Sequence, residues 1–152
     1  MAYLLGQLVE CLWVMFVVLT IHEFGHFFAA YYLGLPVSSV EMGVGPRIFQ
    51  FLWKGIWFRL YLFPLFGFVR TCWLSKKRWK NILMFSAGPL ANFATAFLLY
   101  LVFGEGLRTT HFELLFYVSF FTGAFNLLPI KFRRGDSDGR QILLAFNKRQ
   151  HM

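Results

Sequence analysis

The first thirty or so residues of the chain form one long apolar run that ends at helix-breaking residues. The run extends from Leu4 to about Leu33, and Gly34 and Pro36 follow it. Thirty residues of α-helix rise by roughly 45 Å, more than the roughly 30 Å thickness of the hydrocarbon core of a bilayer. This stretch is therefore predicted to be a membrane-spanning helix over residues 4–33.

Three ionisable side chains, His22, Glu23 and His26, interrupt that run near its end. Histidines four residues apart lie on one face of a helix, so both imidazoles can reach one zinc ion. Glu23 has the position of the general base in H-E-x-x-H metalloproteases. Such a short pattern also arises by chance, but ionisable groups inside a membrane helix are costly and indicate function. We therefore predict that His22 and His26 bind Zn²⁺ and that Glu23 is catalytic.

The composition indicates a polytopic α-helical membrane protein with a single domain over residues 1–152. Hydrophobic residues make up 58% of the chain and charged residues only 14%, against about 25% charged residues in soluble domains. The net charge is +8, and the basic residues are concentrated in blocks 47–80 and 131–149, which indicates membrane topology rather than nucleic-acid binding. Cys11 and Cys72 are expected on opposite sides of the membrane, without a disulfide.

Two further spans are predicted, at about 81–103 and 112–129, after a segment of different character at about 37–73. Glycines and prolines interrupt this segment too often for a spanning helix, and Lys54-Gly55 joins two β-rich runs as a tight hairpin turn. We predict a small interfacial β-element here. Two roles stay open for it: an amphipathic element on the bilayer, or a sheet edge near 48–62 that pairs with an extended substrate.

Basic residues are much more frequent in 33–80 and in the C-terminal tail than in the turn at 104–111. The positive-inside rule then places residue 1 outside the membrane and both basic segments inside. His22 and His26 fall in the inner half of the first span. The site is therefore expected to face the cytoplasmic leaflet.

A catalytic zinc ion typically has three protein ligands and one open position for water, so a third ligand is needed. Asp136 and Asp138 are expected on the same side of the membrane as the histidines, whereas Glu41 is more remote. Both aspartates also have a simpler interpretation, as solvated charges that balance neighbouring arginines. Asp138 stands near the start of an expected helix, which puts it slightly ahead of Asp136.

Five motifs follow one another along the chain: His22 to His26, Gly43 to Pro46, Phe63 to Val69, Ser86 to Asn92, and Asn126 to Pro129 with a later Asp138-Gly139. In this order and spacing they resemble the site-2 protease family of intramembrane zinc metalloproteases, over nearly the whole chain. The resemblance implies a three-helix catalytic core. It also implies that His22, His26 and Asp138 hold zinc and that Glu23 is the catalytic base. Asn126 would orient the substrate or stabilise an oxyanion beside the site.

One spacing departs from the family pattern. Asp138 lies nine residues after Pro129, farther than is usual in the family, and Asp136 lies within the longer stretch as an alternative ligand. The chain is also expected to be a minimal member, without the PDZ or nucleotide-binding modules that some relatives carry.

Three hypotheses about function follow. The first is a zinc-dependent intramembrane endopeptidase that cleaves a membrane-embedded or membrane-associated peptide near the cytoplasmic side. Its expected partners are the bilayer, the substrate and an accessory regulatory protein, and not nucleic acid. The second is a catalytically silent membrane protein that binds or regulates partners on the same scaffold, which would not need Glu23. The third is a metal or haem transporter, which would need more polar groups in the outer half of the bundle than the sequence supplies.

Overall fold

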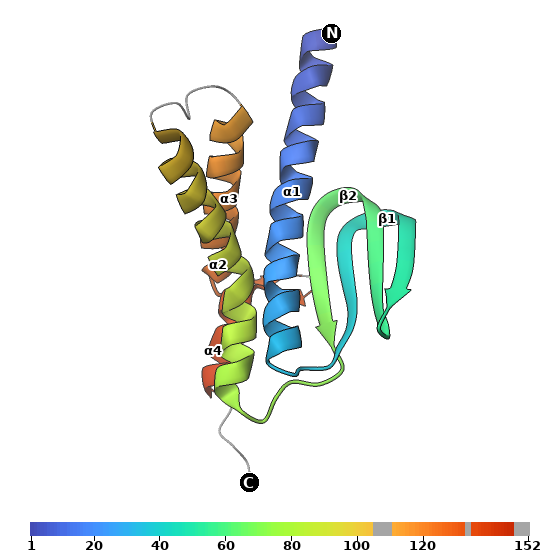
Figure 1. The fold of residues 1–152 in the computed structure, drawn as a ribbon, viewed down its shortest axis with the longest axis vertical. Helices are drawn as coiled ribbons and strands as arrows, with labels where there is room; N and C mark the ends of the chain where they lie inside the picture. The colour runs from blue at the N-terminus through green and yellow to red at the C-terminus, as the bar shows by residue number, and fades with distance from the viewer. Residues whose placement is uncertain (105–110, 133–134, 148–152) are drawn as a thin grey trace.

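The structure is a computed structural model that describes residues 1–104, 111–132 and 135–147. Its helices and strands follow one another in the order α1 (Ala2–Tyr32), β1 (Val37–Trp53), β2 (Ile56–Thr71), α2 (Arg78–Phe103), α3 (His111–Leu127), β3 (Lys131–Phe132), β4 (Gly135–Asp136) and α4 (Asp138–Asn147). Figure 1 shows α1 in the middle, with the sheet of β1 and β2 on one side and α2 and α3 on the other.

Helix α1 carries a buried stripe with a period of four residues. Its members are Val14, Val18, His22, His26 and Ala30. Positions four apart lie one above the other on a helix, so the stripe is the face that packs against the rest of the molecule. The helix ends before Gly34, whose φ of +69° is a left-handed conformation that glycine adopts without strain. The two histidines therefore lie on the buried face, near the C-terminal end of α1.

Helix α2 packs closely against α1 through small residues. A Cβ atom on Gly25 would approach the carbonyl oxygen of Ala87 to 2.6 Å, and a Cβ atom on Gly88 would overlap the ring of His26. Only glycine at these two positions permits the observed approach of the helices. Small residues at a helix interface permit such close packing in membrane proteins.

Strands β1 and β2 are long and bent, so that β2 pairs with β1 twice. Val40 pairs with both Phe58 and Val69, which places residues 37–42 between the two halves of β2. The hairpin turn is at Lys54-Gly55, as predicted, and both residues have positive φ (48° and 80°), as a type I′ turn requires. One edge of the sheet is residues 47–53, and the other edge is the C-terminal half of β2.

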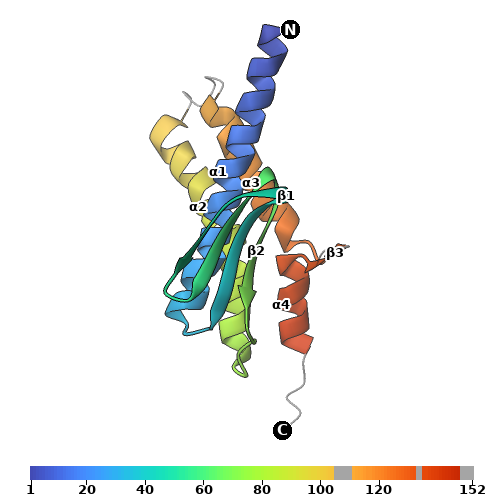
Figure 2. The ribbon, with the colours of Figure 1, turned by 90° about the vertical axis from the view of Figure 1, so that its right-hand side faces the viewer.

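The sheet packs on α1 through an apolar cluster formed by Phe27, Val40, Ile56 and Phe58, with Phe24 beside it. The second half of β2 is thereby held next to the buried stripe of α1. Figure 2 shows α3, β3 and α4 in succession down one side of the molecule, which brings α4 to the end where α1 terminates.

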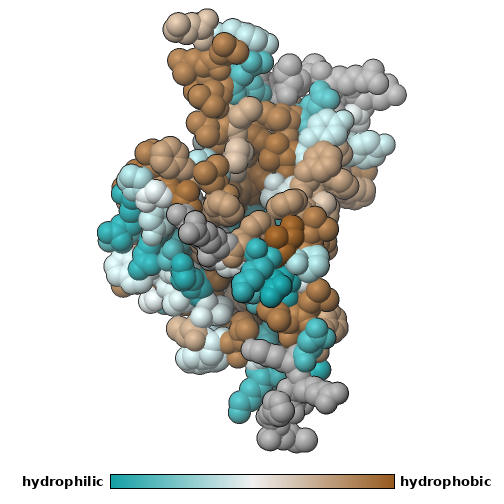
Figure 3. Space-filling model, turned by 180° about the vertical axis from the view of Figure 1, so that it is seen from behind, coloured by the Kyte–Doolittle hydropathy of each residue, from teal (hydrophilic) through white to brown (hydrophobic). Residues whose placement is uncertain are grey.

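Two helices, α1 and α2, are long and apolar enough to span a membrane, with hydropathies of 2.1 and 1.7. Helix α3 has 17 residues, or about 26 Å of rise, and falls short of that length. Apolar side chains cover much of the helical surface in Figure 3, and hydrophilic ones gather over the sheet and the lower part of the molecule. The predicted ranges 4–33, 81–103 and 112–129 all contain helices, but a third span and a three-helix membrane core stay predictions.

Candidate metal centre

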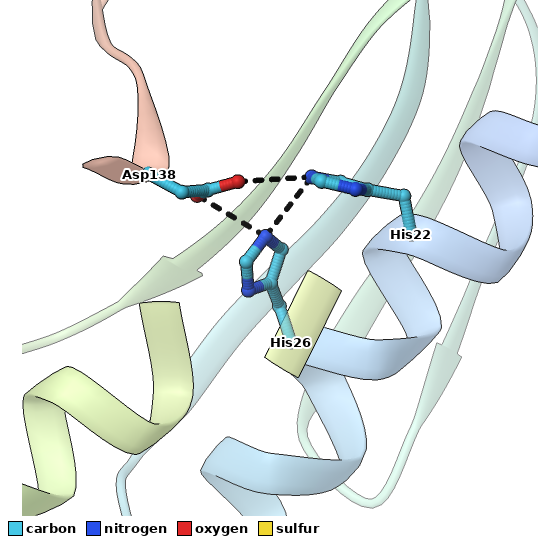
Figure 4. A group of neighbouring side chains, drawn as sticks. All are labelled: His22, His26 and Asp138. Carbon is cyan, nitrogen blue, oxygen red and sulfur yellow. Dashed lines mark hydrogen bonds and ion pairs between the residues drawn. The ribbon is translucent and has the colours of Figure 1, made fainter. Parts of the chain in front are cut away.

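Three side chains from opposite ends of the chain converge on one point (Figure 4). Nε2 of His22 lies 3.1 Å from Oδ2 of Asp138 and 3.2 Å from Nε2 of His26. Nε2 of His26 lies 3.2 Å from Oδ1 of Asp138. Among the described residues no other cluster of three histidine, cysteine or acidic side chains has ligand atoms this close together. Both histidines are buried, and 14% of the Asp138 side chain is exposed.

The arrangement fits a tetrahedral metal ion. Ligand atoms at about 2.0–2.1 Å from a tetrahedral ion lie about 3.3–3.4 Å from one another, close to the three separations observed. His26 donates its Nδ1 proton to the carbonyl oxygen of Met84 at 2.7 Å, so the neutral ring presents the lone pair of Nε2 to the cluster. That lone pair faces the carboxylate of Asp138. The lone pair and the carboxylate repel each other, and a cation bound between them would attract both.

Asp138 is placed by the start of α4. Ser137 caps this helix: its Oγ accepts the backbone N–H of Arg140 (3.3 Å) and of Ile130 (2.9 Å). The same hydroxyl donates to the carbonyl oxygen of Leu128 at 2.5 Å. A Cβ atom on Gly139 would overlap the carbonyl of Leu127, so α4 begins directly against the end of α3. These contacts hold Asp138 within reach of both histidines.

The environment of Asp138 favours its charged form. Burial acts to raise the pKa of the carboxyl, but the imidazole groups of His22 and His26 beside it outweigh burial and lower the pKa to about 2. The group is therefore a carboxylate at neutral pH, which is the form that binds metal.

The other acidic candidates are engaged elsewhere. A carboxylate oxygen of Asp136 lies 2.9 Å from Nε of Arg140, and it does not join the histidine cluster. Glu41 lies in the sheet and pairs with Arg59 at 2.8 Å and Arg70 at 3.3 Å. Of the three acidic residues considered from the sequence, only Asp138 reaches both histidines.

Glu23 is buried next to the cluster but is not a member of it. A Cβ atom on Gly67 of β2 would overlap the Glu23 side chain, so β2 confines that carboxylate closely. Within the described residues the carboxylate makes no ion pair and no hydrogen bond, unlike that of the partly buried Asp138. It is therefore free to bind a ligand in the adjoining cavity.

A cavity of about 1220 Å³ contains this cluster and extends away from it. Its walls come from α1, from residues 65–69 of β2, from α3 and from the start of α4. Asn126 is in the wall, with its amide nitrogen donating to the carbonyl oxygen of Thr122 at 3.0 Å. The histidine cluster found among the described residues does not include it. Glu23 and Asn126 thus face the same space.

Three residues important for the geometry were missed as site residues from the sequence. Gly67 lies against Glu23, Ser137 caps the helix that carries Asp138, and Asn92 contacts His22. The only sequence signal for Asn92 was its polar side chain in an apolar span, which requires a partner. Ser137 stands directly before Asp138 and is a residue type favoured at N-caps.

Comparison with known proteins supports the motif analysis. The family model described as Peptidase family M50 matches residues 10–109, a range that includes His22, Glu23 and His26 but ends before Asn126 and Asp138. A protein from Chlamydia pneumoniae is 30% identical over 64% of this chain and 20% of its own length. One from Thermotoga maritima is 30% identical over 55% of this chain and 20% of its own length. Both bear the name "Putative zinc metalloprotease".

A plant relative is also similar. The chloroplastic protein from Arabidopsis thaliana named "Membrane metalloprotease ARASP" is 37% identical over 41% of this chain and 14% of its own length. The chain spans about a fifth of the length of the first curated relatives that it matches.

Proposed function

The chain belongs to peptidase family M50, in agreement with its resemblance to the site-2 proteases, and on this premise we propose that it is a zinc-dependent intramembrane endopeptidase. One observation carries the proposal: His22, His26 and Asp138 converge at a cavity that Glu23 also lines. A ligand set of two histidines and a carboxylate beside a free glutamate is one of the arrangements that support metal-assisted hydrolysis.

Zinc is the metal proposed for the cluster. The relatives are named zinc metalloproteases, and the donor set of two imidazoles and one carboxylate suits this ion. His22, His26 and Asp138 would hold it and leave one position open toward the cavity. When bound, zinc would polarise a substrate carbonyl and make water nucleophilic near neutral pH.

Glu23 is the proposed general base and acid. Its carboxylate would accept a proton from the attacking water and then return that proton to the leaving amide nitrogen. The contact with Gly67 restricts its position, and the absence of competing partners among the described residues leaves both oxygens for this work. A protein that only binds a partner has no need for a carboxylate placed in this way.

The second half of β2 is the proposed docking edge for the substrate. A helical peptide must unwind before its bonds can be cleaved, and the freed backbone groups need hydrogen-bond partners in an apolar surrounding. Residues 65–69 line the cavity, whereas the edge at 47–53 is on the other side of the sheet. We therefore propose residues 65–69 as the docking strand, in place of the edge near 48–62 that was expected from the sequence. Asn126, on the facing wall, would orient the substrate carbonyl or stabilise an oxyanion.

The membrane arrangement completes the proposal. Helices α1 and α2 have the length and apolarity to cross the bilayer, and we propose that α3 joins them in a multi-pass three-helix core. Basic residues surround the start of α2, and one of them, Lys80, donates a hydrogen bond to the carbonyl oxygen of Leu33 at the end of α1. This favours a cytoplasmic location for that end and an external N-terminus. Cleavage would then occur near the cytoplasmic leaflet, with lipid and an accessory protein as further partners.

The test uses the purified chain in phosphatidylcholine–phosphatidylglycerol vesicles with a pool of synthetic single-spanning peptides, and identifies products by mass spectrometry. Zinc-loaded wild type is expected to cleave members of the pool, and Glu23→Gln is expected to retain zinc and to cleave roughly 10²–10⁴-fold more slowly. Equal cleavage by Glu23→Gln would refute the mechanism. Zinc binding without any cleavage would favour the catalytically silent binding protein instead.

A further inference from the structure

Asn92 of α2 contacts the side of His22 that faces away from the metal cluster. Its Nδ2 lies 3.1 Å from Nδ1 of His22, and Asn92 has no exposed surface. The second polar atom of the same amide, Oδ1, has no hydrogen-bond partner among the described residues. The amide is therefore held by a single contact, to one ring nitrogen of a proposed zinc ligand.

That contact determines which nitrogen of a neutral His22 ring carries the proton. When the Asn92 amide nitrogen donates to Nδ1, Nδ1 is an acceptor and the ring proton is on Nε2. Nε2 then donates to Oδ2 of Asp138 at 3.1 Å. This arrangement satisfies both ring nitrogens of His22 when no metal is bound, but it leaves Nε2 of His22 without the lone pair that a metal needs.

Binding of a metal at Nε2 requires the other tautomer. The ring proton must move to Nδ1, which then needs an acceptor where the Asn92 amide nitrogen now lies. A half-turn of the carboxamide exchanges Nδ2 and Oδ1 in nearly the same volume and provides that acceptor. Within the part of the chain that the structure describes, no other hydrogen bond resists the turn, because Oδ1 is unpartnered.

We propose that Asn92 is the positioning residue for His22 and that its amide turns over when zinc binds. This inference rests on the proposed zinc site. His26 differs, because its Nδ1 faces the backbone oxygen of Met84, which can only accept a proton. His26 therefore already has the tautomer that binds metal through Nε2. His22 differs, because the Asn92 amide can donate to one tautomer of its ring and accept from the other. A carboxylate at position 92 could only accept the Nδ1 proton of the metal-bound tautomer, and an apolar side chain could hydrogen-bond to neither tautomer.

The first experiment measures zinc affinity of the full chain in detergent by competition with a chelator. Asn92→Leu, which has the same branching pattern but no polar atoms, is expected to weaken binding roughly 10–100-fold, the usual cost of losing the hydrogen-bond partner of a metal-bound histidine. Asn92→Asp keeps an acceptor and is expected to bind within a few-fold of wild type. Thr95→Val is the control, because Thr95 lies on the same helix and its hydroxyl donates a local hydrogen bond to the carbonyl oxygen of Ala91.

The second experiment reads the tautomer directly from the ¹⁵N chemical shifts of the His22 ring in wild type, and it does not depend on the folding of a variant. Zinc is expected to move the ring proton from Nε2 to Nδ1. If the ring proton is already on Nδ1 without zinc, the proposed rotation of the Asn92 amide on zinc binding is wrong. Wild-type affinity in Asn92→Leu, or equal loss in the Leu and Asp variants, would overturn the positioning role.

The two proposals fail in different ways. If wild type binds no zinc, the proposed metal site is wrong, and the role of Asn92 fails with it. If wild type binds zinc and cleaves peptides while Asn92→Leu binds as tightly, only the inference about Asn92 is wrong. A uniform loss of thermal stability in Asn92→Leu, with unchanged zinc affinity, would show that Asn92 serves helix packing alone.

Discussion

Oδ2 of Asp138 lies 3.1 Å from Nε2 of His22, although 116 residues separate them in the chain. The contact joins the first helix to the last, and the Ser137 cap and the close packing of Gly139 against Leu127 maintain it. The proposed metal site therefore depends on the fold of the whole described chain, and it can be disturbed from several places.

The choice between the two aspartates is the first prediction. Asp138→Asn is expected to weaken zinc binding by more than the roughly 10–100-fold that loss of a hydrogen-bond partner costs, because a ligand is removed. Asp136→Asn is expected to bind about one zinc per chain as wild type does, because Asp136 pairs with Arg140. The measurement is zinc content and affinity of the purified variants. Zinc loss in Asp136→Asn alone would move the ligand to Asp136.

Gly88→Ala is expected to abolish tight zinc binding while His22, His26 and Asp138 are all retained. The added methyl group would overlap Nε2 of His26 and approach its Cε1 to 2.6 Å, so the ring must leave the cluster. Gly6→Ala is the matched control, since a Cβ atom there meets nothing within 4 Å. Tight zinc binding by Gly88→Ala would contradict the observed packing of α1 on α2.

Gly67→Ala is expected to impair cleavage and to spare the metal. Its methyl group would approach Cδ of Glu23 to 2.5 Å, and Glu23 is not a ligand in the proposed site. Zinc affinity should stay near the wild-type value, and the cleavage rate should fall toward that of Glu23→Gln. Measured together, zinc affinity and cleavage rate distinguish an effect on Glu23 from an effect on the proposed zinc ligands. A parallel loss of zinc would mean that Gly67 supports the whole cluster rather than Glu23.

Ser137→Ala is expected to loosen the start of α4. The hydroxyl caps the helix and also bonds to Ile130 and Leu128, and loss of such a cap costs about 0.5–2 kcal/mol. Both the thermal stability of the protein and its zinc affinity should fall, and Ser137→Thr should restore them. Ser38→Ala, which removes a single bond to the carbonyl oxygen of Arg70, is the control and should change neither. Unchanged zinc affinity in Ser137→Ala would show that Asp138 is held by other contacts.

Local spacing explains what could be inferred about α1 and the hairpin. His22 and His26 share a face because they are four residues apart on a helix, and Lys54-Gly55 makes a turn because both can adopt positive φ. Neither inference needs knowledge of the rest of the chain. The family resemblance rested on the same kind of local motif, and the match to Peptidase family M50 confirmed it.

The tertiary contacts of the candidate site residues could not be inferred from local sequence patterns. Asp136 and Asp138 stand two positions apart, and nothing in that spacing says which of them pairs with Arg140 and which faces the histidines. The substrate edge was expected near 48–62, yet β2 bends back and brings 65–69 to the cavity instead. Asn92 needed a partner by its polarity alone, but only the packing of α2 on α1 shows that the partner is His22.

By itself, the sequence determined the apolar helices, the placement of two histidines on one face of α1, the β hairpin and the family. Periodicity and short-range sterics act over a few residues, so they can be read from the chain directly. The tertiary structure decided that Asp138 is the third member of the cluster, that Gly67 confines Glu23 and that Asn92 supports His22. These outcomes depend on which surfaces of distant helices and strands fit together, and shape complementarity across more than a hundred residues leaves no periodic signal in the sequence.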